Sequence, residues 1–169
     1  TSIKLLFSYN EIPSNIALSS SLFVNNLSLS DLDRTWMCCR WYSDATLPAQ
    51  VPSDLFSRNG ALGNLRGTFS ISLLSVDASD NVTANLSTYR RNPMKIDSNL
   101  VTRAKHANIS NVSYMFGGCK TTQGTVPELW NWLNKLSLKY RTQPFYQMSK
   151  ALITNSSGIP AEWSIGMND

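Results

Sequence analysis

Hydrophobic and polar residues alternate along much of the chain, and this alternation predicts β-strands. Phe69, Ile71 and Leu73 alternate with serines, which is the period-two pattern of a half-buried strand. Residues 82–87 alternate again, and residues 77–81 between the two runs are turn formers. The sequence therefore predicts an antiparallel hairpin at this place.

Further apolar runs, each bounded by turn-forming residues, predict more strands. The run over residues 35–42 is apolar on both faces, as a central strand would be. The other predicted strands cover residues 3–9, 16–24, 111–116 and 146–154. No internal repeat or linker is expected.

One segment has helical periodicity. Residues 125–128 (Thr-Val-Pro-Glu) have the pattern of a capping box with proline in the first turn. Apolar residues then recur at helical spacing, which predicts a helix with one face buried. These residues are Leu129, Trp130, Leu133, Leu136 and Tyr140. A second, short helical turn is predicted over residues 53–58.

Many strands with one or two short helices in their connections indicate a mainly-β fold, an antiparallel β-sandwich of the jelly-roll type. The length favours a single β-sandwich domain over residues 1–169. A hydrophobic content of 42%, with five Trp, six Tyr and six Phe, excludes intrinsic disorder. No apolar run is long enough to predict a membrane span, and the first residues look like a processed or trimmed end.

The composition leaves few candidates for catalysis. His106 is the only histidine, and the two cations before it, Arg103 and Lys105, favour its neutral form. It is expected at the surface or in an interface. Nucleophile, zinc-protease, P-loop and dinucleotide motifs do not occur. The prediction is a protein that is not an enzyme and has no cofactor and no metal. The enzymatic alternative is a carboxylate site around Asp31, Asp33 or Asp44.

The cysteines and the asparagines bear on the compartment. Cys38 and Cys39 are adjacent, and with Cys119 they are expected to be free, packed thiols, with one bridge to Cys119 as the alternative. Six Asn-x-Ser/Thr triplets are modestly more than chance gives in a chain where Ser, Thr and Asn make up 52 of 169 residues. Glycosylation therefore stays open.

Basic residues cluster more than the net charge of +4 requires. Such a patch can neutralise phosphates without reading sequence, which predicts non-specific RNA contact. The alternative is a solvated strand edge, where positive charge prevents unwanted pairing. The candidate nucleic-acid residues are Arg90, Arg91, Lys95, Arg103 and Lys105.

Three tryptophans are candidates for a subunit interface. Trp130 and Trp132 are two residues apart on the predicted helix, so they cannot both face one core. Trp163 lies in a loop-like tail that could reach a neighbouring subunit. Aromatic side chains of this kind are enriched in protein interfaces.

In size, strand rhythm and Ser/Thr/Asn-rich composition, the chain resembles the jelly-roll coat proteins of small icosahedral picorna-like RNA viruses. The resemblance implies a capsid subunit in the virion that assembles with copies of itself and sibling coat subunits around RNA. Unlike many such proteins, the chain lacks a strongly basic N-terminal arm. The alternative is a secreted or surface glycosylated β-sandwich that binds a ligand or host partner.

Overall fold

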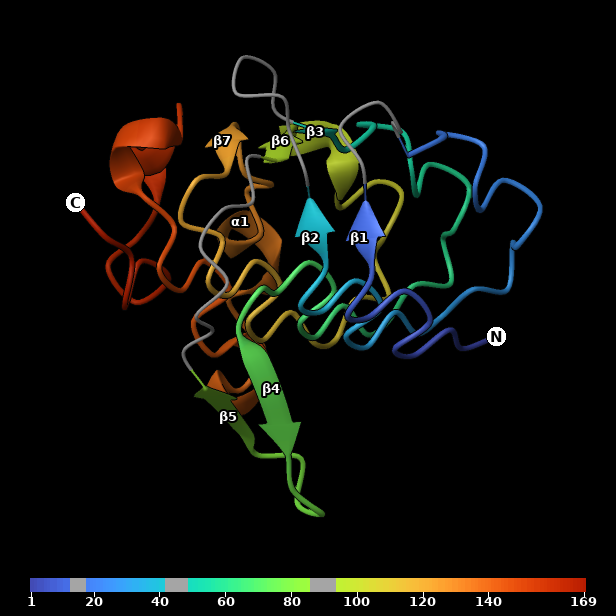
Figure 1. Ribbon diagram of the computed structural model, residues 1–169, viewed down its shortest axis with the longest axis horizontal. Coiled ribbons are helices and arrows are strands. Elements are labelled where there is room, and N and C mark those ends of the chain that lie inside the picture. The colour runs from blue at the N-terminus through green and yellow to red at the C-terminus, as the bar shows by residue number, and fades with distance from the viewer. Residues whose placement is uncertain (13–17, 42–48, 86–93) are drawn as a thin grey trace.

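The chain forms a stack of parallel rungs. A computed structural model describes residues 1–12, 18–41, 49–85 and 94–169. Five segments of this chain lie side by side in sequence order, and we call them rungs 1 to 5. They are residues 2–10, 31–39, 64–72, 111–119 and 140–148. The chain is therefore a solenoid, with the N-terminus at one end of the stack and the C-terminus towards the other (Figure 1).

Backbone hydrogen bonds join neighbouring rungs at every second residue. Between rungs 1 and 2, the N–H groups of Leu5 and Phe7 donate to the carbonyls of Asp33 and Thr35, at 3.2 and 2.9 Å. The intervening N–H groups bond within their own rung, as Ser8 does to the Leu5 carbonyl at 3.1 Å. The inter-rung N–H groups therefore point along the stack towards the C-terminal end, and the inter-rung carbonyls point the opposite way.

Left-handed backbone positions distinguish the rungs from pleated strands. In rung 1 these positions are Leu5 and Tyr9, with φ values of 57° and 61°. Such values cost an L-residue roughly 1–2 kcal/mol, so stacking must stabilise them. The equivalent positions with positive φ in the later rungs are Arg34, Cys38, Gly67, Tyr114, Gly118, Gln143 and Gln147.

A column of aromatic rings runs through the core. Neighbouring rings, one from each rung, are 5.5, 5.1, 5.6 and 6.2 Å apart between centroids, and their planes differ by at most 16°. The column consists of Phe7, Trp36, Phe69, Phe116 and Phe145. Such large rings bury much apolar area and form the central part of the core. The four rings after Phe7 are buried, whereas Phe7 is half-buried.

An Asx turn begins rungs 2, 3 and 4. The side-chain oxygens of Asp31, Asn64 and Asn111 each accept a hydrogen bond from the backbone N–H two residues further on, at 3.0, 3.0 and 3.1 Å. Asp and Asn favour this local bond, which bends the chain into the rung. An Asp or Asn, an apolar residue, three further residues and an aromatic residue therefore form a repeat in these three rungs.

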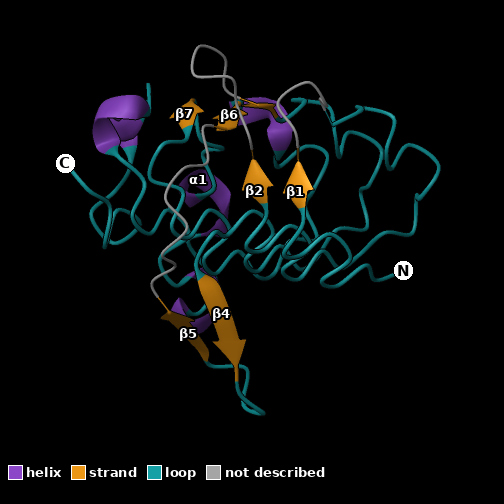
Figure 2. Cartoon of the chain, viewed as in Figure 1, coloured by secondary structure: helices purple, strands orange, loops and turns teal. Residues whose placement is uncertain are grey.

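Short parallel strands complete the other sides of the solenoid. β1 (Glu11–Ile12) pairs with β2 (Arg40–Trp41), and β3 (Ala49–Gln50), β6 (Met94–Ile96) and β7 (Gln123–Gly124) form a three-stranded sheet. The other elements are α1 (Trp130–Leu133), the hairpin strands β4 and β5, and four 3₁₀ helices. The 3₁₀ helices are η1 (Ser98–Leu100), η2 (Leu138–Arg141), η3 (Lys150–Leu152) and η4 (Ser156–Gly158). Most of the described chain is drawn as loop (Figure 2).

The predicted hairpin is confirmed, at a shifted position. β4 (Leu73–Val76) and β5 (Val82–Asn85) are antiparallel and project from the stack (Figure 1). The predicted first strand began at Phe69, but that residue belongs to rung 3. The hairpin is an insertion between rungs 3 and 4, and Leu74 attaches it by packing into a buried cluster. The other buried members are Met37, Cys38 and Tyr114.

The prediction of a jelly-roll sandwich is wrong. Strands make up only 15% of the residues and helices 12%, and the three-stranded sheet is parallel. The physical reason is that a rung, like a strand, is a short apolar run bounded by turn-forming residues, so such runs alone cannot distinguish the two. The expectation of no internal repeat is also wrong, since the rungs are repeated units. The segments between the rungs differ in length, so the sequence shows no fixed period.

The predicted long helix is reduced to the single turn of α1. The capping box does not form: Glu128 accepts a hydrogen bond from the Asn131 side chain at 2.7 Å, and the Val126 N–H donates to the Asn155 side chain at 3.1 Å. The chain then turns back to begin rung 5. Residues 53–58 form hydrogen-bonded turns and no helix.

The expectation of free, packed cysteines is confirmed. Cys38, Cys39 and Cys119 are all buried and unbridged. Burial raises the pKa of Cys38 to about 11 and those of Cys39 and Cys119 to about 12. These thiols therefore act as small core side chains and remain protonated at neutral pH.

Candidate functional site

A hollow of about 270 Å³ lies between α1 and the segment that leads into rung 4. It combines an aromatic ring, aliphatic side chains and two cations. The lining residues are Arg103, Ala107, Ile109, Trp132, Leu133, Lys135 and Leu136. Arg103 and Trp132 came from separate sets of sequence candidates, and the fold brings them together here.

The short helix α1 sets the position of Trp132. Leu129 and Leu133 are buried, and the Leu133 N–H donates to the Leu129 carbonyl at 2.8 Å. Trp130 packs edge-on against Phe145, with ring centroids 6.2 Å apart. Trp132 is half-buried at the hollow. Both tryptophans pack against the same hydrophobic core, so the prediction that they cannot both face one core is wrong.

His106 anchors the opposite wall. Its Nδ1 accepts a hydrogen bond from the Thr102 N–H at 3.1 Å, so its Nε2 carries the proton and donates to the Phe56 carbonyl at 2.9 Å. The side chain is fully buried, which corrects the prediction of a surface or interface histidine. Burial lowers the pKa of His106, so the ring is neutral at pH 7. Arg103 and Ala107, on either side of this anchor, both line the hollow.

The hollow is positively charged. Arg103 and Lys135 are exposed, and no carboxylate is among the lining residues. Within the described part of the chain, neither cation forms an ion pair. Two unpaired cations beside an apolar wall favour an anion that also carries an apolar group.

The other basic candidates are dispersed. Lys95 is exposed on β6, and Lys105 is exposed two residues from Arg103, but neither lines the hollow. Arg90 and Arg91 lie outside the described residues. Of the two cations that line the hollow, Arg103 was a candidate from the sequence and Lys135 was not.

Lys135 is the residue that sequence reasoning missed. Lys135 falls outside the apolar face of the predicted helix, and it reaches the hollow because α1 ends early, at Leu133. Trp163 is also placed unexpectedly: it is buried within this chain, with its ring 5.5 Å from the Arg141 guanidinium. Its role in a subunit interface stays a prediction.

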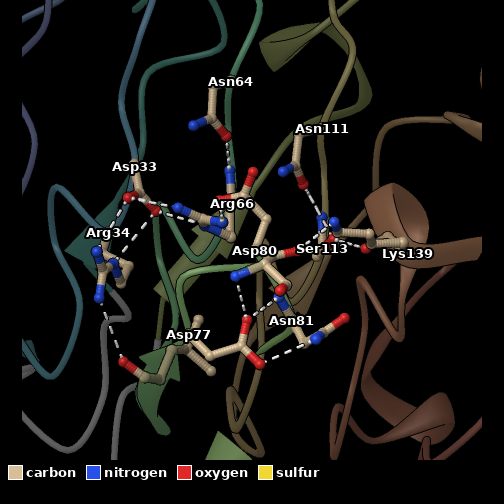
Figure 3. A network of polar contacts seen from close by, with 12 residues as sticks. Asp33, Arg34, Asn64, Arg66, Asp77, Asp80, Asn81, Asn111, Ser113 and Lys139 are labelled. Atoms are coloured by element: carbon tan, nitrogen blue, oxygen red, sulfur yellow. Dashed lines mark hydrogen bonds and ion pairs between the residues drawn. The ribbon is translucent and has the colours of Figure 1, made fainter. Parts of the chain in front are cut away.

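A second charged cluster joins rungs 2 and 3 to the hairpin (Figure 3). The buried Asp33 carboxylate accepts two hydrogen bonds from Arg66, both at 2.9 Å, and two from Arg34. Arg66 also contacts Asp80 in the hairpin loop at 3.2 Å. Burial acts to raise the pKa of Asp33, but the hydrogen bonds and charges of Arg66 and Arg34 outweigh it and lower the pKa.

This cluster holds the hairpin to the stack, because Arg66 contacts both Asp33 and Asp80. The charge of the buried Asp33 carboxylate is neutralised by Arg66 and Arg34 within the cluster. Asp31, the other carboxylate of the enzymatic alternative, forms an ion pair with Lys4 at 3.0 Å. Asp44 lies outside the described residues. Among the residues that are described, no group of three or more His, Cys, Asp or Glu side chains is arranged to hold a metal ion.

Comparisons of this chain with known protein families, curated proteins and solved structures find no match. Across the described residues, none of the helices has the length and apolar character needed to cross a membrane. The function is therefore inferred from the geometry of the hollow.

Proposed function

We propose that this chain is a binding module whose hollow at Trp132 recognises a phosphorylated nucleoside. The observation that supports this is the half-buried Trp132 ring with Arg103 and Lys135 beside it and no carboxylate in the lining. Stacking of a base on an aromatic side chain contributes about 1–3 kcal/mol. The two cations attract the phosphate, which develops the predicted non-specific contact with RNA.

The solenoid suits such a role because stacked repeats present binding surfaces on a rigid frame. The nucleoside phosphate can be a free nucleotide or one residue of a single-stranded RNA, and the chemistry at the hollow is the same in both. Recognition does not depend on base edges in this arrangement, so little base specificity is expected.

The viral coat prediction depends on a jelly-roll sandwich, and the solenoid removes that support. Self-assembly into a shell stays a prediction, and the mass of the native particle is the measurement that tests it. The secreted binding domain likewise loses its sandwich, although its central idea, a protein that binds a ligand, agrees with the proposal.

Calorimetric titration with uridine 5′-phosphate, uridine and inorganic phosphate tests the proposal. The nucleotide is expected to bind at least about tenfold more tightly than either part, because it alone engages both the ring and the cations. Equal binding of uridine and its phosphate would overturn the role of the cations. A short oligouridylate added afterwards distinguishes the two sources: tighter binding than the mononucleotide indicates RNA.

Two variants localise the binding. Trp132→Ala is expected to weaken nucleotide binding about tenfold, since it removes the stacking surface. Lys135→Ala is expected to weaken binding of the nucleotide but not of uridine. Lys120→Ala, which removes an exposed cation outside the hollow, is the matched control. If Lys135→Ala and Lys120→Ala behave alike, the site is elsewhere.

A further inference from the structure

Two turns of the chain pack side by side next to the hollow. Turn A is residues 56–60, and turn B is residues 102–108. The His106 ring bonds turn A through its Nε2 at 2.9 Å, and the Asn108 Nδ2 donates to the Gly60 carbonyl at 2.9 Å. Two hydrogen bonds from side chains of turn B to backbone carbonyls of turn A therefore fix the turns to one another.

Each turn carries an exposed cation that lies outside the hollow, Arg58 in turn A and Lys105 in turn B. Arg58 lies midway between Phe56 and Gly60, the two residues whose carbonyls bond turn B. A Cβ atom added at Gly60 would lie 3.3 Å from the Lys105 carbonyl oxygen, so the two backbones are in contact at this point. Arg58 and Lys105 therefore lie on adjoining segments, beside the hollow that Arg103 lines.

These two cations extend the positive charge of the hollow. Within the described residues, Arg58 and Lys105 form no ion pair. Turn B contains no carboxylate, and the nearest one before turn A in the sequence, Asp54, is exposed. We call the four cations on these adjoining segments the basic strip, which consists of Arg58, Lys105, Arg103 and Lys135.

A row of phosphates matches the basic strip better than a single phosphate does. One phosphate monoester carries up to about two negative charges, which Arg103 and Lys135 already neutralise. Two further cations on adjoining turns fit a ligand that repeats its negative charge along its length. A single-stranded polynucleotide has this repeat, and its unpaired bases are free to stack on Trp132.

We propose that a single-stranded polynucleotide binds along the basic strip, with one base on Trp132 and neighbouring phosphates beside Lys105 and Arg58. This inference rests on the proposed function and extends it from one nucleoside phosphate to a strand. His106 and Asn108 are positioning residues, because they hold together the turns that carry the two outer cations. Phosphate contacts and stacking do not depend on base edges, so RNA and DNA share the required chemistry.

The affinities of octauridylate and of uridine 5′-phosphate, measured at one salt concentration, test the proposal. The octamer is expected to bind at least about thirtyfold more tightly, which exceeds the roughly eightfold statistical gain of eight equivalent nucleotides. A duplex of eight G·C pairs is expected to bind at least about tenfold more weakly than octauridylate, because its bases are already stacked. Octadeoxyuridylate distinguishes the two sources: similar binding supports a site for either strand, and much tighter RNA binding assigns the basic strip to RNA.

Two variants test the outer part of the basic strip. Arg58→Ala and Lys105→Ala are each expected to weaken octauridylate binding about fivefold and to leave uridine 5′-phosphate binding unchanged, since neither residue lines the hollow. Each should also reduce the slope of log affinity against log salt concentration by about 0.7, the value for one phosphate contact on a single strand. Lys120→Ala is the matched control and should change neither quantity. All three side chains are exposed, so the thermal midpoints are expected to equal that of the parent protein.

The outcomes separate this inference from the proposed function. Absence of uridine 5′-phosphate binding at about 1 mM overturns the proposed function. If uridine 5′-phosphate binds but Arg58→Ala and Lys120→Ala affect octauridylate alike, the strand along the basic strip is overturned and the hollow remains a nucleotide site. Equal binding of duplex and single strand overturns the stacked strand. Binding of phosphatidylserine vesicles that Arg58→Ala weakens as strongly would overturn it in favour of a membrane surface.

Discussion

His106 is held by residues that lie far away in the sequence. Its Nε2 bonds the carbonyl of Phe56, 50 residues earlier, while its Nδ1 bonds the nearby Thr102 N–H. The lysine beside it correctly indicated that the neutral form is favoured. The sequence did not indicate burial, because the partner that satisfies the ring is brought close only by stacking of the solenoid.

The burial of His106 predicts loss of stability in mild acid. Burial lowers the pKa of the folded histidine below its usual 6.5, so the unfolded chain binds the proton more readily. The free energy of unfolding is therefore complete above about pH 6.5 and falls as the pH drops towards the folded pKa, by at most about 1.4 kcal/mol per pH unit. Urea unfolding between about pH 7 and 5 measures this slope. His106→Gln should flatten it, and an unchanged slope would assign it to another group.

The Asp33–Arg66 pair is expected to stabilise the fold more than the more exposed Lys4–Asp31 pair, although both join adjacent rungs. Removing one partner of a buried pair leaves an uncompensated charge, which costs about 3–5 kcal/mol. Exposed pairs contribute about 0–1 kcal/mol. Arg66→Met should therefore lower the free energy of unfolding by several times as much as Lys4→Met, as measured by urea denaturation. Similar losses would show that Asp33 finds a sufficient partner in Arg34.

At the scale of elements, local chemistry predicted the hairpin but not the helix. Asp77 accepts hydrogen bonds from the backbone N–H groups of Ser79 and Asn81, so the loop is stabilised by its own residues. The helix after Pro127 is not stabilised by its own residues alone. A helix of ordinary length would carry the chain past the start of rung 5. The chain instead ends the helix early, and the carbonyls of Tyr140 and Thr142 accept hydrogen bonds from rung 4.

Gly67 is where the hairpin docks on the stack, so its replacement should detach the hairpin. A Cβ atom there would lie 2.3 Å from Leu74 Cδ1, and φ is +56°. Gly67→Ala is expected to cost about 1–3 kcal/mol through strain and loss of the Leu74 contact. Gly158→Ala is the matched control, because nothing lies within 4 Å of its Cβ position. Thermal unfolding of the two variants compares them, and equal midpoints would contradict this account of docking.

At the scale of the whole molecule, the stack behaves as a one-dimensional array. Each rung contacts its neighbours, and within the described residues the inter-rung hydrogen bonds of rung 1 go to rung 2 alone. The Phe7 and Phe69 N–H groups each donate to the next rung at 2.9 Å, and they differ in their place in the stack. We expect the Phe7 amide to exchange with deuterium faster than the Phe69 amide, because the end of the stack opens locally. Equal protection would indicate that the array unfolds only as a unit.

The sequence by itself determined those features that neighbouring residues satisfy. The hairpin loop, the Asx turns and the apolar character of the cysteines depend on local chemistry, and the hairpin and the buried thiols were predicted from it. The tertiary structure decided the rungs, the burial of His106 and the meeting of Arg103 with Trp132. Equivalent rung positions such as Asp31, Asn64 and Asn111 are unequally spaced, because the hairpin lengthens one interval. Only hydrogen bonds between distant segments select a rung over a strand, since both are short apolar runs bounded by turn-forming residues.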